Sequence, residues 1–372
     1  MKIIHIAPLN LKKSAGLTYS IPNFVFSQNQ IKDVTSQILV SIKPEIRNES
    51  FFYIDDFENE DEIKIFLSKY DIAIFHSTYI IKHVKLSKIL RDYNIPYVIV
   101  PRGGFTKTSK NVKKIKKRIG DLFIFNKFFN SSFAIHYLTY NEKINSVYKT
   151  VNDFILPNGI TLPNKNIINS DIHDEKHEYT RLIYIGRLNV YIKGLDVLIE
   201  AVSHSKIELI EKKVIIELYG PDKDDSVKEL KKLIEQYDVK NIVKVCPPVY
   251  EFEKENVLRN ADYFIQTSRF EGLPMGVLEA LSYGVPCILT PGTNISSEVE
   301  KHNAGIEVSL EASSISQGIL KVLNTPSKRS EMQKNATKLA NKYSWDSIAS
   351  ESIEIYKKMI WKGNYNEVIR KN

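Results

Sequence analysis

The stretch "SRFEGLPMGVLEALSYGVPCI", residues 268–288, decides how the second half of the chain is interpreted. It carries two glutamates, Glu271 and Glu279, and follows the apolar strand-like run "DYFIQT". The pattern predicts a loop that holds Glu271, then a helix over about 275–283 that carries Glu279 and ends before Gly284. Because helical side chains lean toward the helix N-terminus, both carboxylates could overlook one small space. Two unrelated surface acids are the alternative interpretation.

Short apolar runs rich in β-branched residues recur along the whole chain and alternate with amphipathic stretches. "KIIHIAP", "IAIFHS", "LIYIGR" and "VPCILT" are examples of the runs, and "SVKELKKLIEQY" is one of the amphipathic stretches. This alternation predicts parallel sheets built from βαβ units, and therefore an α/β fold. A polar tract rich in Pro, Asn, Asp and His predicts the boundary between two domains. The expected parts are a first domain over 1–160, a linker over 161–179, a second domain over 180–345 and a terminal helix over 346–372.

The composition favours a soluble two-domain protein. The chain has 372 residues, of which 43% are hydrophobic, and it has no run of 18 apolar residues that predicts a membrane-spanning helix. Its polar start predicts a first strand and not a signal peptide. Only two cysteines occur, which favours a reducing compartment. We therefore expect a cytoplasmic protein.

The net charge of +8 is concentrated in the first domain. Residues 1–160 hold 23 Lys and Arg against 14 Asp and Glu, whereas the remainder is nearly balanced. Such an excess suggests an anionic partner. One segment carries seven cations and no acid, followed by apolar residues at helical spacing: Lys107, Lys110, Lys113, Lys114, Lys116, Lys117 and Arg118. This segment predicts contact with an anionic membrane surface, with a solvated basic face as the alternative. No nucleic-acid motif accompanies it, so we expect no nucleic-acid partner.

A second motif, "IGRLNVYIKGLDVLIEA" over 185–201, places Arg187 after a strand and Lys193 at the start of the next helix. Two cations at these places could clamp a diphosphate, with exposed surface charges as the alternative. In the first domain, Gly16 is expected in the loop after the first strand, and His76 and Arg102 are expected at the ends of later strands. The carboxyl ends of parallel strands are where ligands collect, so these residues are further candidates. No G-x-G-x-x-G is present, and we expect neither a dinucleotide cofactor nor a metal.

These pieces resemble the family-4 retaining glycosyltransferases (glycosyl transferases group 1), which have the GT-B fold. The resemblance rests on "PNGI" at 157–160, the motif at 185–201, "LYGP" at 218–221 and above all the stretch at 268–288, which looks like the family's E-x7-E signature. It implies two Rossmann-like domains with parallel sheets facing a central cleft, and a terminal helix that crosses back to the first domain. It also implies a UDP- or GDP-linked sugar donor.

The resemblance assigns a role to each candidate residue. Arg187 and Lys193 would bind the donor diphosphate and stabilise the leaving group, Glu271 would contact the hexose, and Glu279 would bind the ribose hydroxyls. Gly16 would approach the diphosphate from the first domain. The backbone of Leu273, Pro274, Met275 and Gly276 would contact the sugar and phosphate. The loops with Tyr219, Gly220 and Pro221 and with Val249 and Tyr250 would border the base. Gly186 and Gly272 are further substrate-binding candidates.

One departure concerns the first domain. Many members carry a His where this chain has Arg102, and that His touches the donor sugar. The replacement leaves the local sugar contact open, with His76 as an alternative.

The implied reaction is transfer of a hexose, with retained anomeric configuration, to a saccharide acceptor. We expect that acceptor to be linked to a lipid pyrophosphate at the inner face of the cell membrane, in surface polysaccharide assembly such as that of capsule or O-antigen. Two alternatives stay open: a sugar-nucleotide epimerase on the same architecture, and an inactive nucleotide-sugar-binding protein.

Overall fold

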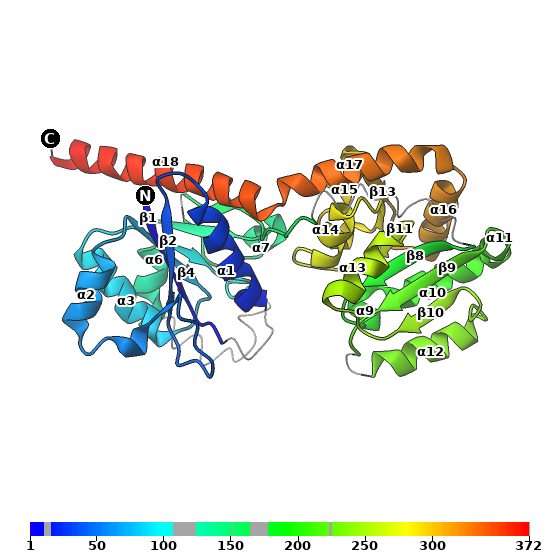
Figure 1. Cartoon of the computed structure of the whole chain (residues 1–372), viewed down its shortest axis with the longest axis horizontal. Coiled ribbons are helices and arrows are strands. Elements are labelled where there is room, and N and C mark those ends of the chain that lie inside the picture. The colour runs from blue at the N-terminus through cyan, green and yellow to red at the C-terminus, as the bar shows by residue number, and fades with distance from the viewer. Residues whose placement is uncertain (11–15, 107–123, 151, 164–177, 223–224, 372) are drawn as a thin grey trace. The chain divides into compact units, whose positions relative to one another are not determined.

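A computed structural model describes residues 1–10, 16–106, 124–150, 152–163, 178–222 and 225–371, with the backbone alone for 361–371. The chain divides into two compact units (Figure 1). Unit 1 comprises Met1–Gly159 together with Trp345–Asn372, and unit 2 comprises Ile160–Ser344. Each unit is an α/β structure around a parallel sheet, which confirms the predicted fold class.

The sheet of unit 1 has seven strands in the order β3-β2-β1-β4-β5-β6-β7. The strands are β1 Lys2–Ala7, β2 Thr35–Val40, β3 Phe52–Tyr53, β4 Ile72–His76, β5 Tyr97–Val100, β6 Ala134–Tyr137 and β7 Phe154–Ile155. The helices are α1 Gly16–Asn29, α2 Glu60–Leu67, α3 Ile81–Asp92, α6 Asn126–Asn130, α7 Tyr140–Ile144 and α18 Trp345–Lys371, with a 3₁₀ turn at Ile54–Asp56. Every residue of β4 and β5 is buried, as expected for central strands of a parallel sheet that is covered on both faces.

Helix α18 belongs to unit 1 although it follows all of unit 2 in the chain. It packs beside α1 (Figure 1). Its first turns bring Trp345 and Ile348 against Phe24 of α1 and Leu156 after β7. A Cβ on Gly159 would lie 2.5 Å from the Trp345 ring, so this contact requires glycine there. The start of α18 is therefore fixed inside the core of unit 1.

The sheet of unit 2 has six strands in the order β10-β9-β8-β11-β12-β13. The strands are β8 Thr180–Ile185, β9 Val214–Tyr219, β10 Val243–Cys246, β11 Tyr263–Gln266, β12 Cys287–Leu289 and β13 Gly305–Glu307. The helices are α9 Val190–Lys193, α10 Leu195–His204, α11 Lys206–Glu211, α12 Ser226–Gln236, α13 Glu251–Arg259, α14 Met275–Ser282, α15 Ser296–Lys301, α16 Ala312–Leu323 and α17 Arg329–Lys342, with 3₁₀ turns at Pro291–Thr293 and Pro326–Lys328. Two hydrophobic clusters cover its strands.

The expected helix of the opening stretch is present as α14, with Pro274 at its N-cap. Gly284 follows its last turn with φ of 73°, in the left-handed region where glycine ends a helix without strain. The N–H of Val285 donates to the carbonyl oxygen of Ala280, which closes that end. The predicted strand, loop, helix and glycine stop are all confirmed.

Candidate functional site

The sheet of unit 2 has a topological switch point between β8 and β11. The chain proceeds from β8 to β9 and β10 on one side of the sheet and then returns to β11 on the other side of β8. In open parallel sheets, ligands bind outside the carboxyl ends of the strands at such a point. The loops that follow β8 and β11 hold Arg187 and Glu271, so both sequence motifs lie at this edge.

Glycines allow the backbones at this edge to approach closely. A Cβ on Gly220 would lie 1.7 Å from the carbonyl oxygen of Gly186, and one on Gly276 would lie 2.6 Å from that of Ile185. The N–H of Gly186 donates to Tyr219 over 3.0 Å, and the N–H of Leu188 donates to Pro221 over 3.0 Å. The ends of β8 and β9 and the start of α14 are therefore packed together, and any larger residue at these glycines would push them apart.

Lys193 has a different local setting from the expected one. The side chain of Asn189 accepts a hydrogen bond from Ile192 N (2.8 Å) and starts the short helix α9, which ends at Lys193. Gly194 then adopts φ of 61° and separates α9 from α10. The prediction that Lys193 opens the next helix is wrong, because the Asn189 cap adds a turn of helix before it.

Lys193 and Glu271 form an ion pair in this structure. Their side chains are only 16% and 13% exposed, so the pair is weakly screened by solvent. The same oxygen of Glu271 accepts hydrogen bonds from Gln266 (2.7 Å) and from Ser268 (3.0 Å). One carboxylate is thus oriented by a cation and two neutral donors, and it reaches the cation that was expected to bind phosphate.

Hydrogen bonds hold the loop between β11 and α14 in place from two sides. Arg269 donates to both carboxylate oxygens of Asp196 at 2.7 Å and to the carbonyl oxygen of Tyr191 at 2.6 Å. On the other side, the amide of Asn294 donates to the carbonyl oxygens of Glu271 (2.5 Å) and Gly272 (3.2 Å). These bonds fix the backbone that presents Glu271 before any ligand binds.

Glu279 lies in the second turn of α14 and pairs with Lys254 of α13 over 2.7 Å. Among the residues that the structure describes, no hydrogen bond or ion pair joins Glu279 to Glu271. Each acid has its own cation. At the start of the same helix, Val277 and Leu278 donate to the carbonyl oxygen of Pro274. The N–H groups of Met275 and Gly276 have no intrahelical acceptor and face the entry of the helix, where an anion is favoured.

The remaining candidates of unit 2 lie around this edge. The Arg187 side chain is exposed, and within the described residues its guanidinium makes no ion pair. Its carbonyl oxygen accepts a hydrogen bond from the Tyr184 hydroxyl over 3.0 Å, which fixes the backbone at this residue. Val249 and Tyr250 follow β10 and precede α13, and the Tyr250 side chain is 62% exposed.

In unit 1, His76 ends β4 and is fully buried. Its Nε2 lies 2.9 Å from Nδ1 of His5, whose Nε2 lies 2.9 Å from the Gln28 carbonyl oxygen. Because that oxygen can only accept, His5 carries its proton on Nε2 and His76 donates to His5. His76 therefore presents a lone pair at Nδ1, where Arg102 Nη2 lies 3.4 Å away.

Burial keeps these histidines neutral. It lowers the pKa of His5 to about 4, and burial followed by the adjacent Arg102 charge lowers the pKa of His76 well below its usual value. Since both ring nitrogens of His76 are engaged, His76 orients Arg102, and a ligand would meet Arg102 first.

Arg102 itself is held in an unusual backbone conformation. Its φ is 49°, a left-handed value that costs energy for a residue other than glycine. Glu142 accepts hydrogen bonds from the N–H groups of Gly103 and, over 2.8 Å, Leu138. The carboxylate ties the loops after β5 and β6 together and stabilises this conformation.

Two further expectations concern other parts of the chain. Gly16 was expected in the loop after the first strand, but it is the first residue of α1, and residues 11–15 before it lie outside the described residues. The basic segment from Lys107 to Arg118 also lies outside them. Within the described residues, no helix has the length and apolar character needed to cross a membrane, and no group of His, Cys, Asp and Glu has the geometry to hold a metal ion.

Comparison with known proteins relates this chain to glycosyltransferases. Residues 166–339 match the family model described as Glycosyl transferases group 1. An uncharacterised glycosyltransferase of Methanocaldococcus jannaschii is 26% identical over 221 residues, which cover 59% of this chain and 55% of that protein. The chain spans about half the length of the curated relatives it matches.

Solved structures show the same fold over nearly the whole chain. Anabaena HepE, solved in complex with UDP, superposes with a TM-score of 0.70 at 15% identity and covers 96% of this chain and 100% of its own. WaaG, a glycosyltransferase involved in lipopolysaccharide biosynthesis, superposes with a TM-score of 0.60 at 14% identity and covers 95% of this chain and 99% of its own. Residues 166–339 are therefore similar to the glycosyl transferases group 1 family, and the chain has the fold of these solved GT-B glycosyltransferases.

Proposed function

We propose that this protein is a retaining glycosyltransferase that moves a hexose from a UDP- or GDP-linked donor to a saccharide acceptor. The observation that carries the proposal is the Lys193–Glu271 pair at the switch point of unit 2, beside the glycines that bring β8, β9 and α14 together. A nearly buried cation paired with an oriented carboxylate suits a ligand that has both phosphate and hydroxyl groups.

The proposed roles follow from the charges and their places. Lys193, the exposed Arg187 and the free N–H groups at the start of α14 would bind the diphosphate and stabilise its charge as it leaves. When phosphate takes Lys193, the Glu271 carboxylate keeps its Gln266 and Ser268 donors and turns its other oxygen to a hexose hydroxyl. Glu279, in the second turn of α14, would accept hydrogen bonds from the ribose hydroxyls.

The proposed chemistry is attack from the face that the diphosphate leaves. A donor phosphate oxygen takes the proton of the acceptor hydroxyl while the glycosidic bond to the diphosphate breaks. The two cations are placed to stabilise the charge that develops on the leaving group. Same-face attack gives retention of the anomeric configuration, which distinguishes it from simple inversion.

Donor and acceptor are proposed from the named neighbours. HepE has been solved with UDP and with UDP-glucose, which favours a uridine donor here. The role of WaaG in lipopolysaccharide biosynthesis supports a lipid-linked saccharide acceptor in surface polysaccharide assembly.

We place this acceptor at the inner face of the cell membrane, with the segment from Lys107 to Arg118 as the anionic-lipid contact. Flotation with anionic and neutral liposomes tests the contact, and equal binding to both would contradict it.

The function is tested with nucleotide-sugars. Thermal unfolding is measured with UDP, GDP and their glucose, galactose and mannose conjugates, because a ligand that binds only the folded state stabilises it by about 2.7 kcal/mol at a hundredfold excess over its Kd. Conjugates that stabilise the protein are then incubated with and without saccharide acceptors, and NMR reads the anomeric configuration of any product.

Each outcome separates the proposal from its alternatives. We expect a product with retained configuration only when acceptor is present. Conversion of the donor sugar without acceptor would identify an epimerase, and binding without turnover over a broad acceptor panel would identify an inactive binding protein. A product with inverted configuration would overturn the proposed mechanism.

A further inference from the structure

Lys193 has two candidate partners at the carboxyl edge of unit 2. Its ammonium is assigned to the donor diphosphate, and in this structure it pairs with the Glu271 carboxylate. Within the described residues, this ammonium has no other ion-pair or hydrogen-bond partner. A lysine ammonium is a compact charge that can pair with a carboxylate or with a phosphate. A phosphate that binds Lys193 must therefore displace Glu271 or share the cation with it.

The backbones near the two residues are joined, which holds their side chains within reach of each other. The Thr267 hydroxyl donates to the carbonyl oxygens of Lys193 (3.3 Å) and Gly194 (3.0 Å). A Cβ on Gly194 would lie 2.0 Å from the carbonyl oxygen of Thr267, so the two segments are in close contact. The ion pair is therefore built into this edge, and any anion that competes for Lys193 meets it with little screening by solvent.

Neutral donors hold Glu271 as well as the cation does. Gln266 and Ser268 are buried, and they donate to the same carboxylate oxygen that Lys193 contacts. Among the described residues, the other oxygen of Glu271 has no hydrogen-bond partner. When an anion takes Lys193, the carboxylate loses the charge that balances its own. The two neutral donors replace only part of that loss, because hydrogen bonds between charged groups are the stronger ones.

A diphosphate that carries a hexose and one that does not therefore meet different resistance. A hexose hydroxyl can donate to the second oxygen of Glu271, which compensates the carboxylate for the lost cation. A nucleoside diphosphate without the hexose offers that oxygen no donor. It brings its own negative charges close to Glu271, and repulsion between like charges at short range weakens its binding.

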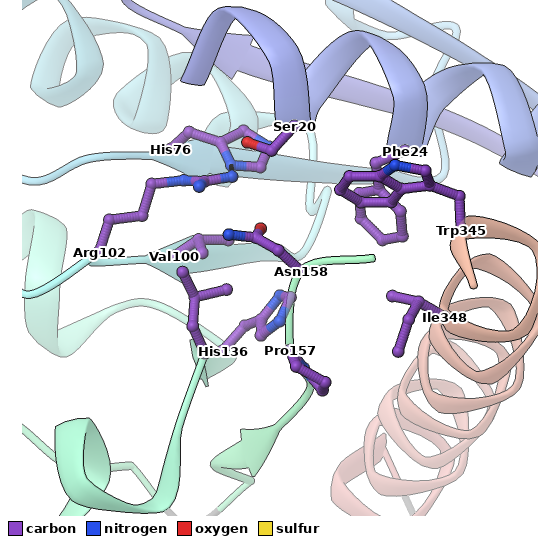
Figure 2. Close-up of a pocket in the computed structure, with 11 residues that line it drawn as sticks. Ser20, Phe24, His76, Val100, Arg102, His136, Pro157, Asn158, Trp345 and Ile348 are labelled. Atoms are coloured by element: carbon purple, nitrogen blue, oxygen red, sulfur yellow. Dashed lines mark hydrogen bonds between the residues drawn. The ribbon is translucent and has the colours of Figure 1, made fainter. Parts of the chain in front are cut away.

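The carboxyl edge of unit 1 shows that a cation can be oriented there without an acid. Figure 2 shows Arg102 beside His76 at the small cavity of unit 1, with Trp345 and Phe24 on its other side. Nη2 of Arg102 lies 3.4 Å from Nδ1 of the neutral His76. The cavity measures about 10 Å³, and none of the described residues that line it is an acid. A neutral acceptor is enough to orient a cation, whereas the carboxylate beside Lys193 also affects which anions can take its place.

We propose that Glu271 is an internal competitor for Lys193, which weakens the binding of a nucleoside diphosphate that carries no hexose and so favours the donor over the spent nucleotide. The proposal rests on the proposed function, because it takes Lys193 as a ligand of the diphosphate. When the hexose has moved to the acceptor, the carboxylate returns to Lys193 and the nucleoside diphosphate is released. Glu271 thus acts both in binding the hexose and in releasing the product.

The experiment measures affinity with and without the charge of Glu271. Glu271→Gln keeps an oxygen that can accept from Gln266 and Ser268 and removes the negative charge. Isothermal titration calorimetry on the full chain compares UDP with UDP-glucose and, in a parallel arm, GDP with GDP-mannose.

The nucleoside diphosphate that the protein binds should bind Glu271→Gln about five- to tenfold more tightly. This factor lies between the effect of an exposed ion pair and that of a hydrogen bond to a charged group. The matching nucleotide-sugar should not gain affinity, because an amide oxygen is a weaker acceptor for a hexose hydroxyl than a carboxylate is. In stopped-flow measurements, dissociation of the nucleoside diphosphate should slow by a similar factor, since affinity changes within one site are mostly changes in dissociation rate.

Asp262→Asn is the matched control. Asp262 directly precedes β11, at the opposite end of the strand from Glu271, and its side chain is also 13% exposed. It pairs with Arg329 over 2.5 Å, so the substitution removes an equally buried carboxylate from an ion pair that does not include Lys193. The affinities for nucleotide and nucleotide-sugar should both equal those of the unchanged protein.

Failure of the internal competitor is distinguishable from failure of the proposed function. If nucleotides bind but Glu271→Gln binds UDP and GDP no more tightly than the unchanged protein, the competitor is overturned and the donor site remains. An equal gain for nucleotide and nucleotide-sugar would also overturn it, because the hexose would then not compensate Glu271. If neither nucleotides nor nucleotide-sugars bind the unchanged protein, the proposed function fails and this inference fails with it.

Discussion

The carboxyl edges of the two sheets carry different kinds of residues. In unit 2, the acids Glu271 and Glu279 each have a cation, Lys193 and Lys254, and neutral donors fix the first pair. In unit 1, the corresponding edge carries neutral buried histidines, one arginine and polar atoms that have no hydrogen-bond partner within the described part of the chain. The comparison teaches that parallel sheets of the same kind can carry paired charges at one carboxyl edge and buried neutral groups at the other.

The largest expected difference between the edges is their response to acid. Burial lowers the pKa of His5, His83 and His136 in unit 1 to between about 3 and about 4, below the unfolded value of about 6.5. The unfolded chain therefore binds more protons as the pH falls, and the stability of unit 1 is lost from about pH 6.5 downward. Between pH 7 and pH 5 the loss is about 2 kcal/mol for each histidine.

This loss is measured by urea unfolding at a series of pH values. Both tryptophans, Trp345 and Trp361, belong to unit 1, so their emission follows that unit, while circular dichroism follows both. The emission midpoint should fall between pH 7 and pH 5, and His83→Phe should reduce the slope by one histidine's share. A midpoint that does not move over this range would break the comparison, because it would mean that the histidines are already charged in the folded state.

The second effect concerns the ionic edge of unit 2. Lys193→Ala removes the cation that we propose stabilises the leaving diphosphate, so kcat for transfer should fall by about 10²–10³-fold. Lys206→Ala is the control, since Lys206 forms an ordinary surface pair with Asp238. Steady-state kinetics with circular dichroism on both variants checks the prediction. Turnover of Lys193→Ala within a few-fold of the control would remove Lys193 from the mechanism.

The smallest effect sharpens the difference between the two acid–cation pairs of unit 2. Lys254 and Glu279 are 31% and 29% exposed, about twice as much as Lys193 and Glu271, so solvent weakens their interaction. Lys254→Met should raise KM for the donor about two- to fivefold and leave kcat unchanged, because Glu279 is assigned to ground-state ribose binding. Lys232→Met, an exposed lysine of α12, is the control. If kcat fell by the same factor as kcat/KM, Lys254 would instead contribute to stabilising the transition state.

The secondary structure of the site could be predicted because its signals are local. The apolar run before Ser268, the Pro274 start and the Gly284 stop each act over a few residues, and the structure confirms all three. Helix α9 was missed because its one turn depends on the Asn189 cap, a signal too short to stand out from sequence.

The contacts that arrange each edge could not be predicted in the same way. Lys193 and Glu271 are 78 residues apart, and which cation an acid reaches depends on how the loops after two neighbouring strands converge. Trp345 reaches the cavity of unit 1 from the far end of the chain. A polar residue inside an apolar strand was the available signal: His5 in "KIIHIA" and Gln266 in "YFIQ" both prove to be buried and hydrogen-bonded.

Helix α18 also sets an order of folding during synthesis. Ribosomes deliver a chain from its N-terminus, and domains generally fold as units when their residues have emerged. Unit 2 is complete once Ser344 is available, whereas unit 1 still lacks Trp345, Ile353 and Tyr356, which fill its core. The unit that is made first is thus the one that is finished last. A chain arrested after Ser344 would carry a folded unit 2 and an incomplete unit 1, in which the apolar surface that α18 covers would be exposed.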